Sequence, residues 1–133
     1  MFDLTKMIDS FTHRHVFIQT HNFPDPDAIA SAYGLQYLLH SRGLESTIIY
    51  KGKVEHGSSN AMVKKLGIEI IEYSDMTEMS QDAEIILVDS QKGNANIIDM
   101  HFLFGGVHAG PEMRWSALTI ILYLANHNIL FLI

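Results

Sequence analysis

The sequence predicts an α/β domain in which helices flank both faces of a mostly parallel sheet. Short aliphatic segments alternate along the chain with segments of helical pattern, and this alternation implies right-handed crossovers between parallel strands. Histidine and aspartate residues directly follow two of the aliphatic segments, which is where open α/β folds keep their sites. At 133 residues the chain is expected to form one domain with a single hydrophobic core.

Composition excludes several classes of protein. The hydrophobic content of 47% and the charged content of 18% are typical of a globular chain rather than a disordered one. A net charge of −6 argues against strong nonspecific binding to duplex DNA. Because there is no cysteine, disulfides, zinc–thiolate sites and thiol nucleophiles are excluded, and a cytoplasmic location is expected. The N-terminal residues include acidic side chains, so they predict a short amphipathic helix rather than a signal peptide.

The first predicted strand covers residues 15–20, and a helix over residues 28–41 follows it. Asp25 is the expected N-cap, since its carboxylate can accept a hydrogen bond from the first turn. Pro26 suits that turn because its φ angle is already helical and it has no N–H to leave unpaired. Asp27 lies in the same turn, where negative charge is favoured by the helix dipole.

Three further strands are predicted from short β-branched or aliphatic segments, at residues 46–50, 68–72 and 83–88. A polar loop and a short helix over residues 60–66 connect the first two of these strands. A polar stretch over residues 73–81 leads to the last strand, with one helical turn expected around residues 77–79.

Three potential metal ligands occur where the first strand passes into the helix: His21, Asp25 and Asp27. No lysine or arginine lies among them, so the two carboxylates would repel each other unless a positive ion sat between them. Imidazole together with carboxylate oxygen suits Mn²⁺ or a similar divalent ion. The simpler alternative is a capped helix that happens to follow a histidine. It accounts for both aspartates, but it does not explain why a histidine and two aspartates gather in one turn without a lysine or arginine.

Asp89 directly follows the last predicted strand. The carboxyl ends of parallel strands lie at one edge of the sheet, so Asp89 is expected to meet His21, Asp25 and Asp27 in space. The alternative is an aspartate that only forms the turn before Ser90. We expect Asp89 to complete the metal site.

The order of these motifs resembles the DHH phosphoesterase superfamily. The residues that carry the resemblance are H-x3-D-x-D after a strand, a helix opening Ala-Ile-Ala-Ser-Ala, and a strand ending Val-Asp-Ser. The superfamily includes RecJ-type single-strand exonucleases, nano-RNase/pAp phosphatases and family II pyrophosphatases. The loop with His56 and Asn60 is similar to the nano-RNase branch, which disfavours the pyrophosphatases. The resemblance extends from His15 to Asp99.

The resemblance implies a Mn²⁺-dependent phosphoesterase that hydrolyses short single-stranded oligonucleotides or phosphorylated nucleotides such as pAp. It places one ion on His21, Asp25 and Asp89, and a second ion on Asp27 with Asp89 as the bridging carboxylate. Asp27 and Asp89 are therefore the expected catalytic residues. Two such ions about 3.5–4 Å apart activate a water molecule and stabilise the phosphoryl oxygens.

The sequence departs from the family pattern after Asp89, where no Asp-His-His motif follows. His101, in Asp-Met-His, and His108 are the nearest candidates for the missing ligand, and the alternative for each is a loop histidine. The second, substrate-binding domain of the family is also absent, so residues 1–133 are expected to form one truncated DHH-type domain. The competing hypothesis is an incomplete, catalytically inactive remnant that binds a nucleotide or a protein partner.

The C-terminal residues 117–133 are very apolar, but Asn126, His127 and Asn128 interrupt them. A spanning helix needs about 20 predominantly apolar residues, so no membrane segment is expected. Exposed apolar surface in a truncated domain can drive self-association, and a homo-oligomer is a possible assembly.

Overall fold

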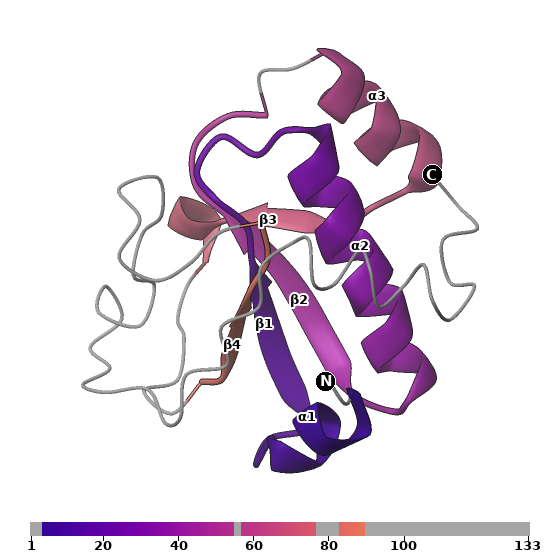
Figure 1. Ribbon diagram of the computed structural model, residues 1–133. Coiled ribbons are helices and arrows are strands. Elements are labelled where there is room, and N and C mark those ends of the chain that lie inside the picture. Colours follow the sequence, from indigo (N-terminus) through magenta and orange to yellow (C-terminus); the bar gives the residue numbers. More distant parts are fainter. Residues whose placement is uncertain (1–3, 55–56, 77–82, 90–133) are drawn as a thin grey trace.

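The computed structural model describes residues 4–54, 57–76 and 83–89, which form an α/β fold around a parallel sheet (Figure 1). The fold class predicted from the alternating pattern is thereby confirmed at this level. The elements are, in order, α1 (Leu4–Ser10), β1 (His15–Gln19), α2 (Pro26–Ser41), β2 (Glu45–Tyr50), α3 (Gly57–Leu66), β3 (Ile70–Glu72), the 3₁₀ turn η1 (Tyr73–Asp75) and β4 (Ile85–Leu87).

Strand β1 lies inside the sheet, whose described strands follow the order β3-β2-β1-β4 and are all parallel. Ile18 of β1 is opposite Ile48 of β2 on one side and Ile86 of β4 on the other. Because the strands are parallel, their carboxyl ends share one edge, and the chain leaves β1 and β4 next to each other at that edge.

The main core lies between α2 and one face of the sheet. Val16, Ile18 and Ile86 point to this face and are fully buried. The helix side chains that join the same core are Ile8 from α1, and Ile29, Ala32, Leu35, Leu38 and Leu39 from α2. Figure 1 shows α2 lying across the sheet with α3 beside it, and Met62 and Val63 of α3 pack against the same cluster.

A second, smaller cluster lies on the opposite face of the sheet. It contains buried Ile49 and Ala83, and Phe17, Tyr73 and Ile85 pack against them. Within the described residues no α-helix contributes to this cluster, so the structure supports helical cover on one face. The prediction of helices on both faces is therefore confirmed for the face that α2 covers.

Several predicted boundaries differ from those observed, for local physical reasons. Helix α2 begins at Pro26 rather than at residue 28, because Asp25 caps it: its Oδ1 accepts a hydrogen bond from Ala28 N at 2.9 Å. Helix α3 begins at Gly57 rather than at residue 60. The 3₁₀ turn lies at Tyr73–Asp75, since the Glu72 carboxylate accepts a hydrogen bond from Ser74 N at 2.9 Å. The predicted turn at residues 77–79 lies outside the described residues.

Core packing predicts a large difference between two Ile→Ala variants in strands. Ile18 in β1 is 0% exposed and Ile71 in β3 is 37% exposed. We expect Ile18→Ala to lower the free energy of unfolding by about 2–5 kcal/mol, because it removes buried methyl groups and leaves a cavity. Ile71→Ala serves as the control and should cost less than roughly 1 kcal/mol, as expected for a site that already faces solvent. Urea unfolding measures both, and equal losses would contradict the assignment of β1 to the sheet interior.

Candidate metal centre

The histidine of the site is oriented by its own backbone. His21 follows β1, and its Nδ1 lies 2.8 Å from the carbonyl oxygen of Asn22. A carbonyl can only accept, so Nδ1 carries the proton and donates it. Neutral His21 therefore has its lone pair on Nε2, the arrangement found in metal-ligating histidines whose second nitrogen is held by a carbonyl.

The free nitrogen of His21 faces two carboxylates. His21 Nε2 lies 3.8 Å from Asp25 Oδ1 and 3.6 Å from Asp89 Oδ2. One ligand atom from each of the three residues lies within 4.8 Å of the others. These separations exceed hydrogen-bond length. They suit an ion between the atoms, because octahedral ligands about 2.1 Å from an ion lie roughly 3–4.2 Å from one another.

The three residues of this group were all predicted as ligands, and the structure brings them together. Asp25 is held in place as the N-cap of α2, while Asp89 follows β4 on the neighbouring strand. A backbone hydrogen bond of 2.9 Å from Val88 N to Gln19 O aligns the ends of β4 and β1. The parallel pairing of those strands is therefore what brings Asp89 to His21.

Asp27 is not part of this group. It lies in the first turn of α2 and its side chain is exposed. Its charge nevertheless acts on Asp89, since it raises the pKa of that carboxyl. The second ion expected on Asp27 and Asp89 remains a prediction.

Asn60 belongs to the loop that resembles the nano-RNase branch, and the structure describes it. Asn60 uses its side chain locally, where Nδ2 donates to Val54 O at 2.8 Å. His56 of the same loop lies outside the described residues, as do His101 and His108, the candidates for the missing ligand.

Charge crowds around Asp89. Burial raises the pKa of the Asp89 carboxyl, neighbouring His21 lowers it, and the carboxylates of Asp25 and Asp27 raise it, so that the pKa lies above its ordinary value of 3.8. Asp89 also has a left-handed backbone, with φ of +52°. The raised pKa disfavours the ionised carboxylate in this position, and a bound cation would offset the repulsion.

Two features of the loop between β1 and α2 escaped the sequence analysis. The Asn22 carbonyl that orients His21 left no signal, because any residue supplies a carbonyl. The side-chain oxygen of Asn22 is buried without a hydrogen-bond partner among the described residues. Phe23 has a left-handed φ of +53° and is 51% exposed, and its N–H donates to Lys51 O at 2.8 Å.

Comparison with known proteins gives no activity. No protein-family model matches the chain. It is similar to an uncharacterised protein of Methanocaldococcus jannaschii, with 36% identity over 75 residues, which is 56% of this chain and 16% of that protein. Among the residues that the structure describes, no helix combines the length and hydropathy needed to cross a bilayer. The function is therefore argued from the site.

The charge crowding predicts that Asp89→Asn stabilises the metal-free protein at pH 7. Because the folded-state pKa of Asp89 is raised, its stabilising contribution is complete below the ordinary value of 3.8 and is lost as pH rises through the folded-state value. Asparagine removes that penalty and tolerates a left-handed backbone. We expect a gain below about 1 kcal/mol, since solvent screens a partly exposed charge.

Urea unfolding in EDTA at pH 7 and at pH 3.5 measures this effect, with Asp75→Asn on η1 as the charge-matched control. The gain from Asp89→Asn should shrink at the lower pH. A variant less stable than the wild type at pH 7 would contradict the repulsion.

The loop geometry predicts that Gly52→Ala is destabilising. Gly52 has φ of +87°, and a Cβ placed on it would lie 2.5 Å from Phe23 Cε1. The ring must move and the backbone is strained, so we expect a loss of about 1–3 kcal/mol in thermal unfolding. Gly57→Ala is the control, because a Cβ there meets no atom within 4 Å. Equal stability of the two variants would show that Phe23 does not pack on Gly52.

Proposed function

We propose that this protein is a metal-dependent phosphoesterase whose ion is held by His21, Asp25 and Asp89. The observation that carries the proposal is the convergence of one imidazole nitrogen and two carboxylates from separate parts of the chain. They meet at the carboxyl edge of a parallel sheet, the usual location of sites in open α/β folds.

The donor set fits a divalent cation better than a metal-free cluster. In a metal-free cluster, a protonated His21 would pair with both carboxylates. The Nε2 distances of 3.8 and 3.6 Å are too long for the hydrogen bonds that such a pair would form. Nitrogen and oxygen ligands without sulfur suit Mn²⁺. We propose Mn²⁺ rather than another divalent ion because of the resemblance to the DHH superfamily.

The chain itself holds two of the proposed ligands rigidly. The Asn22 carbonyl fixes the ring of His21, and the hydrogen bond from Ala28 N fixes the carboxylate of Asp25. Helix α2 begins at the same place, and the Asp25 cap together with Asp27 in its first turn already uses the positive end of its dipole. When bound, divalent ions in such sites activate water and stabilise the phosphoryl oxygens.

The finer assignments rest on the motif resemblance. They are a second ion on Asp27 with Asp89 as the bridge, and catalytic roles for these two residues. The proposed substrates are short single-stranded oligonucleotides or a phosphorylated nucleotide such as pAp. A cytoplasmic location is proposed because the chain has no cysteine, and self-association is proposed from its apolar C-terminal segment.

A second candidate function is supported by the position of Asp27. Within the described residues the structure groups three ligands, and Asp27 stays outside them. An inactive remnant that binds a nucleotide or a protein partner is expected to have one complete ion site. The number of ions bound discriminates between the two functions.

Calorimetric titration of the 133-residue chain with Mn²⁺ tests the proposal, with Mg²⁺ and Zn²⁺ titrated in parallel. We expect Asp89→Ala to abolish binding and Asp27→Ala to remove one ion at most, because Asp89 is proposed to serve both ions. Gln36→Ala, on the middle of α2, is the control and should bind like the wild type. Equal losses in the two aspartate variants would contradict the bridging role.

Hydrolysis of pAp and of a dinucleotide, each with Mn²⁺, completes the test. Two bound ions with phosphate or nucleotide release would support the phosphoesterase. One bound ion without hydrolysis would favour the remnant, and a wild type that binds none of the three metals would refute both metal-dependent assignments.

A further inference from the structure

Strand β4 carries no hydrophobic pattern that specifies its register. Residues 85–88 are Ile, Ile, Leu and Val, so both faces of the strand are aliphatic. Ile86 and Val88 are fully buried on the α2 side, and Ile85 packs in the cluster on the opposite face. A one-residue slip would place aliphatic side chains on both faces again, and register is weakly specified in such a strand.

The register of β4 matters because Asp89 follows it directly. Neighbouring positions in a strand are about 3.3 Å apart along its axis. The contact between His21 Nε2 and Asp89 Oδ2 is 3.6 Å. A slip of one residue would therefore move Asp89 by nearly the whole length of this contact.

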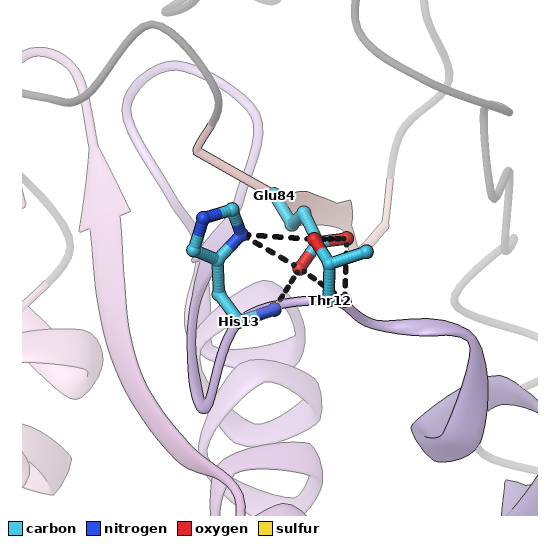
Figure 2. A network of polar contacts seen from close by, with 3 residues as sticks. All are labelled: Thr12, His13 and Glu84. Atoms are coloured by element: carbon cyan, nitrogen blue, oxygen red, sulfur yellow. Dashed lines mark hydrogen bonds and ion pairs between the residues drawn. The ribbon is translucent and has the colours of Figure 1, made fainter.

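Glu84, directly before β4, makes polar contacts that depend on the register of the strand. Both carboxylate oxygens of Glu84 accept from Thr12 N, at 3.0 and 3.1 Å, and Oε2 also accepts from His13 N at 3.0 Å. The Thr12 hydroxyl donates to Oε1 at 3.2 Å, and His13 Nδ1 lies 3.3 Å from Oε2. Figure 2 shows the Glu84 carboxylate held between these two residues, which come just before β1.

The contacts of Glu84 are made to the ionised carboxylate. Burial acts to raise the pKa of Glu84, but hydrogen bonds from the backbone and side chains of His13 and Thr12 outweigh it and hold the pKa below its ordinary value. The backbone of the same residue pairs with β1, since Phe17 N donates to Glu84 O at 2.9 Å. Glu84 is thus bound to the chain around β1 through both its main chain and its side chain.

We propose that Glu84 is a positioning residue that sets the register of β4 on β1 and so places Asp89 against His21. The inference rests on the proposed function, because it takes the three-ligand group as the ion site. Glu84 precedes β4 and Asp89 follows it, so Glu84 acts through the strand that joins the two residues.

The length and charge of Glu84 both contribute to this role. Glu84→Asp keeps the charge but shortens the side chain by one carbon, so it should behave like Glu84→Ala. Glu84→Gln keeps the length and one acceptor oxygen, so it should retain part of the function. Gln36→Ala is the control, because Gln36 also ties its side chain to the backbone, with Nε2 donating to Ser46 O at 3.0 Å.

Amide hydrogen exchange of the full chain in EDTA measures the register without any metal. Val88 N donates to Gln19 O across β4 and β1, whereas Thr20 N donates to Ile49 O across β1 and β2. In Glu84→Ala we expect protection at Val88 to fall about tenfold relative to protection at Thr20, because strands open locally. Glu84→Asp should show the same fall, Glu84→Gln a smaller one, and Gln36→Ala none.

Mn²⁺ titration of the same variants measures the consequence for the site. We expect Kd to rise about tenfold or more in Glu84→Ala, because misplaced ligands bind ions weakly, and to be unchanged in Gln36→Ala. An unchanged ratio of Val88 to Thr20 protection in Glu84→Ala would overturn the proposal. So would a changed ratio with unchanged Mn²⁺ affinity. If the wild type binds no metal, the proposed function fails, and the exchange ratio alone decides whether Glu84 sets the register.

Discussion

The parallel pairing of β1 with β4 is the constraint on which the rest of the site depends. Each of these strands leads into a residue of the candidate metal group, His21 after β1 and Asp89 after β4. Antiparallel strands would send these residues to opposite edges of the sheet, whereas parallel strands deliver both to one edge. The hydrogen bond from Val88 N to Gln19 O holds the two ends level, and the remaining ligand, Asp25, is supplied by the cap of the helix that follows β1.

The group of His21, Asp25 and Asp89 concentrates negative charge at a place where this charge adds little to the stability of the fold. The pKa of Asp89 is raised, so its ionised carboxylate is disfavoured in the metal-free protein, and its backbone is left-handed. Arrangements of this kind cost stability and are found mainly where chemistry requires them. That cost is a physical reason to interpret the cluster as a binding site rather than as a structural ion pair.

The segment that carries His21 and Asp25 is held by contacts that use ordinary backbone groups. His21 is held by the carbonyl of Asn22, Asp25 by the N–H of Ala28, and Phe23 by the carbonyl of Lys51. Glu84 extends this principle to the far end of β4, where it accepts from the backbone of Thr12 and His13. A site supported in this way can depend on residues that never touch the ion.

The sequence by itself determined the α/β class, the order of the elements, the N-cap at Asp25 and the three residues of the candidate metal group. All of these depend on local pattern: strand-forming residues, capping chemistry, and polar side chains at the ends of strands. Tertiary structure decided that Asp27 stays outside the group, that Asn22 orients His21, and that Glu84 reaches the chain before β1. These contacts depend on strand register and backbone direction. The side chains of β4 are all aliphatic and so do not specify its register, and every residue has a backbone carbonyl, so residue type does not show which carbonyl will be used.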